Sequence, residues 1–136
     1  MPASLDDRRY SKEHEWVMLR GDVAVIGITD YAQEQLGDVV YVDLPEPGSA
    51  ITQFEKMGEI ESVKAVSDLY TPASGEVVRV NDGLVEKPEV VNSDPHGDGW
   101  LIELRLSDAS ELEKLLSAAD YDAFIANESK DEALGP

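Results

Sequence analysis

Short runs of β-branched and aromatic residues, each closed by a cluster of turn-forming residues, recur along most of this chain. The runs lie at 16–19, 23–26, 39–42, 57–61, 66–70, 76–80 and 100–106. Glycine, proline, asparagine and aspartate gather between them, as at 20–22, 45–48, 72–75 and 81–83. Runs of this kind favour strands, and many short strands joined by turns favour a small sandwich or barrel. We therefore expect a mainly β fold.

One short helix is expected between the first hairpin and the strand at 39–42. Thr29 or Asp30 has the position of an N-cap, and Gly37 has that of a terminating glycine. These two signals bound a helix of about two turns.

The C-terminal part also changes to a helical pattern. Asp108 and Glu111 form a capping pair, and the leucines at 112, 115 and 116 fit one helix face. A second short helix is expected at 119–125. Residues 88–99 are rich in turn formers, which predicts a loop before the last strand.

The length of 136 residues suits a single domain covering 1–136, and no linker divides it. The ends, about 1–9 and 128–136, are polar, and we expect them to be flexible. No apolar run is long enough to span a bilayer, and the acidic start is unlike a signal or transit peptide. The expected location is the cytoplasm.

The charge and the cysteine content restrict partners and chemistry. With 29 acidic and 11 basic residues the formal charge is −18, which disfavours nucleic acids and anionic membranes. Such a surface either attracts partners with basic patches or only keeps a small protein soluble. The chain has no cysteine, so disulfides, thiolate nucleophiles and cysteine-bound metals are excluded. Any sulfur chemistry must come from a cofactor.

Catalytic and metal-binding patterns are weak. The chain lacks a nucleophile elbow, a phosphate-binding loop and a dinucleotide fingerprint. His14 stands between Glu13 and Glu15, but a lone histidine among acids near a strand start is more often a surface residue than a metal ligand. His96, in the turn-rich loop, is expected to be solvent-exposed. We assign no catalytic residue and no metal site.

Lys64 occupies a position suited to modification. It lies between the strands expected at 57–61 and 66–70, at the apparent tip of a tight strand–turn–strand unit. A lysine there projects from the sheet with its amine in water, where a modifying enzyme can reach it. From the pattern alone, an ordinary exposed lysine is the more frequent explanation.

The segment 61–77, Glu-Ser-Val-Lys-Ala-Val-Ser-Asp-Leu-Tyr-Thr-Pro-Ala-Ser-Gly-Glu-Val, resembles the lipoylation motif of glycine cleavage H proteins. The resemblance covers nearly the whole chain. Further family-like segments follow in the family's order and spacing: Tyr10 with His14-Glu15-Trp16, residues 27–33, 36–40 and 42–45, Leu84 with Pro88-Glu89, residues 91–95, and Gly99-Trp100.

The resemblance implies the barrel-sandwich hybrid fold of lipoyl and biotinyl carriers, with an added N-terminal hairpin and C-terminal helices. It also implies a carrier and not an enzyme. Lipoate is joined by an amide to Lys64 as N6-lipoyllysine. Glycine decarboxylase (P protein) places an aminomethyl group on this arm, aminomethyltransferase (T protein) passes the carbon to tetrahydrofolate, and dihydrolipoyl dehydrogenase (L protein) reoxidises the dithiol. A lipoate ligase or lipoyl transferase attaches the arm.

Three acids are candidates for supporting roles. Glu61 and Asp68 stand three residues before and four residues after Lys64, so we expect them to help the modifying enzyme recognise the hairpin. We also expect Glu15 and Asp68 to pair with the ammonium of the loaded arm and shield it. The alternative for all three is plain solvated charge.

The chain departs from the family pattern at two positions. Phe54 stands where relatives often have glycine, so a positive φ there would strain it. Glu13 stands where relatives often have serine, which puts in doubt any role carried over to that position.

Other functions remain open from the sequence. A biotin carrier normally has methionines beside its lysine, and a 2-oxoacid dehydrogenase lipoyl domain has aspartate before it, whereas here the neighbours are Val63 and Ala65. An H-like protein that donates lipoyl groups to other enzymes would use the same Lys64. An unmodified interaction module or a small hydrolase is the alternative from a different class.

Overall fold

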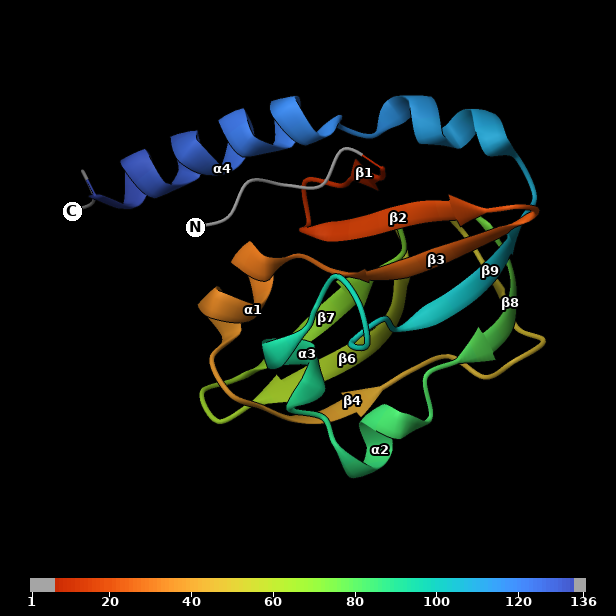
Figure 1. Cartoon of the computed structure of the whole chain (residues 1–136), viewed down its shortest axis with the longest axis horizontal. Coiled ribbons are helices and arrows are strands. Elements are labelled where there is room, and N and C mark those ends of the chain that lie inside the picture. The colour runs from red at the N-terminus through yellow and green to blue at the C-terminus, as the bar shows by residue number, and fades with distance from the viewer. Residues whose placement is uncertain (1–6, 134–136) are drawn as a thin grey trace.

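The computed structural model describes residues 7–133, with side chains to residue 127, and two antiparallel sheets dominate it (Figure 1). The larger sheet has the spatial order β1 (Arg9–Tyr10), β2 (Glu15–Arg20), β3 (Val23–Ile28), β9 (Ile102–Leu106), β8 (Gly75–Val80) and β5 (Ala50–Ile51). The smaller has the order β4 (Val39–Asp43), β6 (Lys56–Ser62) and β7 (Val66–Tyr70). This confirms the predicted mainly β fold, and the N-terminal hairpin β2–β3 extends the larger sheet instead of standing apart from it.

The main core lies between the two sheets. Ile26 of β3 and Leu104 of β9 pack in one cluster with Ile60 of β6, and all three are fully buried. Burying such a side chain contributes about 1.5–3 kcal/mol relative to leaving it exposed. The small sheet, which carries the candidate lysine, is thereby fixed to the rest of the molecule.

The predicted first helix is confirmed as α1 (Asp30–Leu36). Thr29 is its N-cap, and its hydroxyl accepts a hydrogen bond from the Ala32 amide at 3.2 Å. Gly37 ends it with φ +78°, a left-handed conformation that glycine adopts without a Cβ penalty.

The C-terminal helices differ from the prediction in type and length. Residues Ala109–Lys114 form a 3-10 helix, η1, and Ala118–Ala133 form α4, which starts where expected but continues well beyond 125. Asp108 caps η1, but the predicted capping role of Glu111 is wrong. Its carboxylate instead accepts hydrogen bonds from the amide and hydroxyl of Ser74, both at 2.8 Å.

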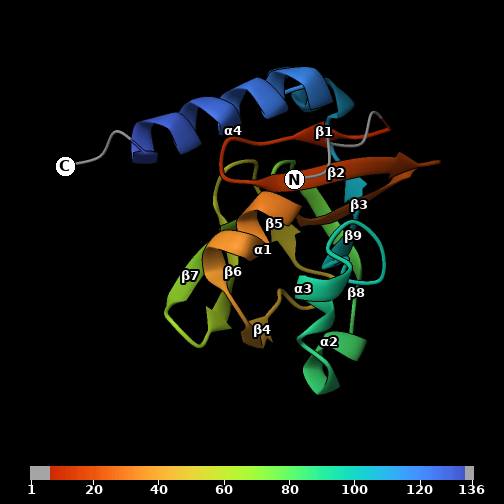
Figure 2. The ribbon, with the colours of Figure 1, turned by 60° about the vertical axis from the view of Figure 1, so that its left-hand side comes forward.

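Helix α4 lies beside β1, at one edge of the larger sheet (Figure 2). Tyr121 of α4 stacks on Tyr10 of β1, with 4.7 Å between ring centroids. Trp16 of β2 and Tyr31 of α1 belong to the same buried cluster. A second, aromatic-rich core thus joins α4 to the hairpin and to α1.

The region predicted as a loop at 88–99 contains regular structure. α2 (Gly83–Glu86) precedes it and α3 (Val90–Ser93) lies within it, and they bury Leu84 and Val91. Four-residue helices are too short to show a periodic pattern. His96 is not solvent-exposed as expected: it is half-buried, and its Nε2 accepts a hydrogen bond from the Asp30 amide at 3.4 Å.

Residues 8–10 pack against the larger sheet. Arg8 is buried, with its guanidinium 4.6 Å from the centre of the Trp16 ring, and Tyr10 pairs with Trp16 in the sheet. Arg8 and Arg9 therefore contribute to the fold, although the sequence placed them in a segment expected to be flexible. Residues 1–6 and 134–136 lie outside the described residues, and the backbone up to Ala133 is helical.

The backbone of Phe54 has the strained conformation that was expected if its turn required a positive φ. Phe54 has φ +68°, in the left-handed region, and its amide donates to the carbonyl of Thr71 at 2.7 Å. The hydrogen bond fixes this conformation although the residue is not glycine.

Candidate attachment site at Lys64

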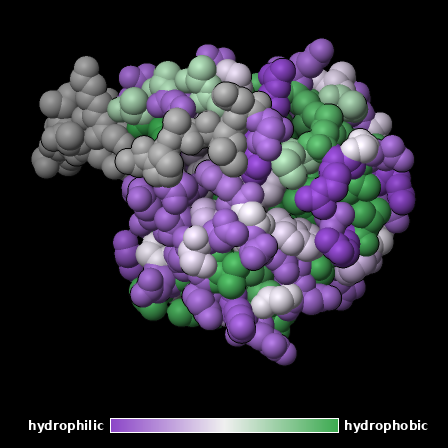
Figure 3. Space-filling view, viewed as in Figure 1, coloured by the Kyte–Doolittle hydropathy of each residue, from purple (hydrophilic) through white to green (hydrophobic). Residues whose placement is uncertain are grey.

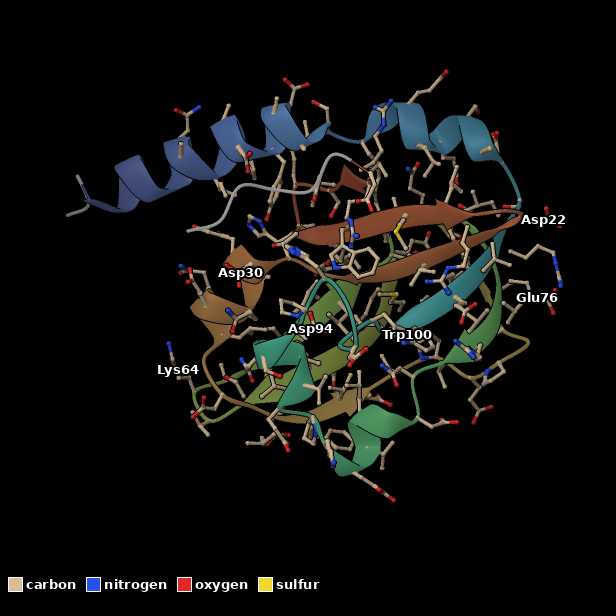
Figure 4. All side chains as sticks on the ribbon, in the orientation of Figure 1. Asp22, Asp30, Lys64, Glu76, Asp94 and Trp100 are labelled. Carbon is tan, nitrogen blue, oxygen red and sulfur yellow. The ribbon has the colours of Figure 1, made fainter. Side chains whose placement is uncertain are left out.

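Lys64 lies at the exposed tip of the β6–β7 hairpin, at the edge of the molecule (Figure 4). The two strands are antiparallel, and Glu61 pairs with Val66 next to the tip and Glu59 with Asp68 further from it. This pairing confirms the predicted strand–turn–strand unit. The tip points away from the sheet, so that an enzyme can approach the amine from solvent.

Ser62 holds the tip closed. Its buried hydroxyl oxygen accepts hydrogen bonds from the amides of Lys64 at 3.1 Å and Ala65 at 3.3 Å. Its own amide donates to the Ala65 carbonyl at 2.9 Å. A serine hydroxyl can organise a turn in this way, which explains a tight hairpin without an Asn-Gly or Asp-Gly pair. No pattern in the sequence predicts this role of Ser62.

The tip is anchored to the segment that joins α1 to β4. The Val63 amide donates to the Asp38 carbonyl at 3.0 Å. From α3, Asn92 accepts a hydrogen bond from the Val39 amide at 2.8 Å and donates to the Gly37 carbonyl at 2.9 Å. Asn92 therefore fixes the support on which the hairpin rests, and nothing in its local sequence signalled this.

The side chain of Lys64 lies over Gly37. A Cβ atom on Gly37 would come within 2.8 Å of Lys64 Cε and 3.6 Å of Nζ. The ammonium donates a hydrogen bond to the carbonyl of Gln35 at 3.4 Å, at the C-terminal end of α1. A cation is favoured there because the last carbonyls of a helix carry partial negative charge.

A cleft of about 310 Å³ extends from this point between α1, the start of β2 and the β6–β7 hairpin. Gln35, whose carbonyl accepts the bond from Lys64, also lines the cleft. The walls are partly apolar and partly acidic: Glu13, His14, Glu15, Ile28, Tyr31, Ala32, Gln35, Leu36, Ile60, Ser67, Asp68 and Leu69. Two predicted site residues, Glu15 and Asp68, are thus brought together at the cleft.

Glu15 is more deeply buried than the sequence suggested, with 2% of the residue exposed. Ser11 Oγ donates to its carboxyl group at 2.6 Å, and the Tyr70 amide donates at 3.4 Å. Burial raises the pKa of the Glu15 carboxyl to about 8, although both hydrogen bonds act to lower it. The group is therefore mostly protonated at neutral pH.

Asp68 is exposed at the cleft rim and is already paired. Its carboxylate is 3.1 Å from the ammonium of Lys56, which also contacts Glu59 at 2.8 Å. These two carboxylates raise the pKa of Lys56. Glu61, by contrast, makes no ion pair with any residue between 7 and 127, and it faces outward from the sheet.

His14 is a structural link and not the surface residue expected. It has φ +72°, and its Nδ1 lies 2.8 Å from the Tyr121 hydroxyl, which is 2.6 Å from Thr29 Oγ1. This chain of hydrogen bonds connects α4 with the N-cap of α1 beside the cleft. Within the described part of the chain, no group of three or more histidines and acids is arranged to hold a metal.

A two-sheet β-sandwich that presents an exposed lysine at a hairpin tip, with an open cleft beside it, defines the lipoyl and biotinyl class of carrier proteins. The family model described as glycine cleavage H-protein matches residues 8–128. The chain belongs to the glycine cleavage H-protein family. It is accordingly a carrier and not an enzyme, and its cofactor is lipoate bound covalently to a lysine.

Similar proteins support the same assignment over most of the chain. The glycine cleavage system H protein of Symbiobacterium thermophilum is 57% identical over 118 residues, covering 87% of this chain and 92% of that protein. That of Thermotoga maritima is 52% identical over 121 residues, covering 89% and 98%. A crystal structure of the H protein from Mycobacterium marinum superposes with a TM-score of 0.82 at 40% identity, covering 88% and 97%. Among the described residues, no helix is long and apolar enough to cross a membrane.

Proposed function

We propose that Lys64 is the lysine that carries lipoate and that the cleft beside it receives the attached arm. The observation that carries this proposal is the exposed Lys64 amine at the tip of a closed hairpin, inside the family-like segment 61–77. The amide forms when the deprotonated amine attacks an activated lipoyl carbonyl, whose activating group leaves. The bound dithiolane supplies redox-active sulfurs and accepts the aminomethyl group derived from glycine.

The residues around Lys64 fit such an arm. The lysine stem already lies against Gly37 and points along the end of α1, where the cleft begins. Ala32 and Leu36, which are partly exposed, give the cleft apolar surface for a hydrocarbon chain. Burial of that chain against the cleft is favourable because it removes apolar area from water.

We assign Glu15 and Asp68 to shielding the charged end of the arm. Asp68 at the rim is paired with Lys56, and Glu15 in the wall holds a proton at neutral pH because burial raises its pKa to about 8. An ammonium that enters the cleft favours the ionised form of Glu15, so the carboxyl group gives up its proton as the pair forms. The support for this assignment is that both residues line the same cleft.

We assign Glu61 to recognition by the enzyme that attaches lipoate. Its carboxylate is exposed on β6 beside the tip. Glu61→Gln removes the charge but keeps the shape, and we expect slower lipoylation with unchanged folding. Glu86→Gln on α2 is a matched control for an exposed acid elsewhere. An unchanged rate at limiting enzyme contradicts the assignment.

The partners that we propose are the glycine decarboxylase, the aminomethyltransferase, the dihydrolipoyl dehydrogenase and a lipoate ligase or lipoyl transferase. The formal charge of −18 suits docking patches that are basic. We propose the cytoplasm as the location, because a carrier that cycles through a dithiol works best in a reducing compartment.

Lys64→Arg is the decisive variant. It keeps the positive charge but offers no amine that can be acylated. After incubation with the attaching enzyme and lipoate, we expect the mass increase of one lipoyl group in the wild type and none in Lys64→Arg. Lys56 and Lys87, both near turns, serve as internal controls and must stay unmodified. Lipoylation of the Lys64→Arg protein contradicts the proposal.

A further inference from the structure

Exposed apolar side chains gather around the Lys64 tip. Seven large hydrophobic residues are exposed within the described part of the chain, and four of them lie on or beside the small sheet. These four are between 47% and 68% exposed: Val40, Tyr41, Val63 and Val66. The view in Figure 3 is mostly hydrophilic, with apolar patches that include the lower left, the side on which Figure 4 shows Lys64.

The strand register joins these side chains into one surface. Tyr41 of β4 pairs with Glu61 of β6, and Glu61 pairs with Val66 of β7. All three are exposed on the outer face of the small sheet, and Val63 continues the surface to the tip. We call this surface the tip face and define it by Tyr41, Glu61, Val63 and Val66.

The next row on the same sheet has a different character. Asp43 pairs with Glu59, and Glu59 pairs with Asp68. Lys56 bridges Glu59 and Asp68, so both of these carboxylates have a cationic partner within the protein. Glu61 on the tip face has no such partner among residues 7–127. The tip face therefore presents apolar groups on both sides of one uncompensated carboxylate.

We propose that the tip face is the docking surface for the enzyme that attaches lipoate. The proposal rests on the proposed function of Lys64. The matching partner surface is an apolar depression with one arginine or lysine opposite Glu61. Apolar contacts supply affinity, and the charge pair fixes orientation.

The attaching enzyme is favoured as the partner over the enzymes that use the finished arm, because the atom that it acylates lies close to the protein surface. Lys64 Nζ rests on the end of α1, close to the body of the protein. An enzyme that acylates this atom must bring its active site against the hairpin. Enzymes that act on the dithiolane meet it at the far end of an extended chain, so they need not cover the same face.

The test uses the full, unmodified chain and the purified attaching enzyme. In the double variant Tyr41→Thr/Val66→Thr, both positions hold threonine, a β-branched residue suited to strands, and both lose apolar surface. Initial rates of lipoylation are followed by intact mass over a range of carrier concentrations, and binding is measured by calorimetry. We expect KM and Kd for the carrier to rise about tenfold, equivalent to about 1.4 kcal/mol, with kcat nearly unchanged.

The matched control is Leu19→Thr/Val85→Thr, which removes two other exposed apolar side chains, on β2 and α2. This control is expected to leave KM and Kd at the wild-type values. Both double variants are then lipoylated at saturating enzyme, and the arm is chemically reduced to the dithiol. Oxidation of this dithiol by dihydrolipoyl dehydrogenase, with a nicotinamide dinucleotide as the electron acceptor, is expected to proceed at the wild-type rate.

The outcomes separate the two proposals. If wild-type Lys64 is not lipoylated, the proposed function fails. If Lys64 is lipoylated but the tip-face variant has the wild-type KM and Kd, the docking inference alone is wrong. The docking inference is also wrong if the tip-face variant loses as much activity with dihydrolipoyl dehydrogenase as with the attaching enzyme. The tip face would then contact several partners and not the attaching enzyme in particular.

Discussion

The side chain of Lys64 packs directly against Gly37, so closely that a Cβ at Gly37 would lie 2.8 Å from Lys64 Cε. The same residue ends α1 with φ +78°. Glycine is therefore required there for two separate reasons, backbone conformation and space for the lysine stem. The two reasons can be separated, because Gly21 and Gly48 have positive φ angles of +63° and +91° with no atom near the missing Cβ.

We expect Gly37→Ala to disturb Lys64, whereas Gly21→Ala and Gly48→Ala do not. All three variants should lose about 1 kcal/mol or more of unfolding free energy, because alanine is strained at positive φ. Only Gly37→Ala should also shift the NMR signal of the Lys64 ε-carbon and slow lipoylation several-fold. Equal behaviour of the three variants in both measurements would show that space for the lysine is unimportant.

Glu15 should make folding stability depend on pH. Its pKa of about 8 in the folded state exceeds the ordinary value of 4.5, so the folded protein holds a proton that the unfolded chain releases. The resulting stability is fully present below the unfolded pKa and is lost as pH rises through the folded pKa. Relative to Glu15→Gln, the wild type should lose about 2 kcal/mol between about pH 6 and pH 8. Urea unfolding at the two pH values measures this, and parallel changes in both proteins contradict the burial argument.

Glu15 and Asp68 should also determine how long the loaded arm holds its aminomethyl group. Formaldehyde release without the aminomethyltransferase should be several-fold faster from Glu15→Gln and Asp68→Asn than from wild type. Glu61→Gln, on the outer face, is the control and should match the wild type. If both cleft variants retain the group as long as wild type does, neither carboxyl group shields the arm.

At position 54 a glycine variant should be more stable than an alanine variant, which is the reverse of the usual order. At ordinary strand or helix positions glycine is less stable than alanine by about 0.5–1 kcal/mol. Because Phe54 has φ +68°, Phe54→Gly should be more stable than Phe54→Ala by about 1 kcal/mol. Both variants lose the ring, so the comparison isolates backbone strain. Chemical denaturation of the pair checks the sign, and a more stable alanine variant would contradict a strained turn.

Local signals in the sequence predicted the parts of the site that depend on neighbours along the chain. The N-cap at Thr29, the terminating Gly37 and the hairpin around Lys64 were all confirmed. The strain at Phe54 was expected from the family resemblance, because relatives often have glycine there, and its positive φ confirms it.

Contacts between distant segments were the part that the sequence could not supply. Glu111 satisfies both the amide and the hydroxyl of Ser74, so its expected capping role is lost. Glu15 is mostly protonated at neutral pH because packing between distant segments buries it, although the hydrogen bond from the Tyr70 amide favours the ionised form. The support of the tip by Asn92 likewise spans distant segments. Each depends on packing that no periodic pattern encodes.

The central claim, lipoate on Lys64, is tested most directly by peptide mass spectrometry of the protein purified from its native cells. A digest that isolates the segment around Lys64 should show the mass of one lipoyl group on that lysine and unmodified Lys56 and Lys87. A fully unmodified Lys64, or a lipoyl group on any other lysine, would contradict the account.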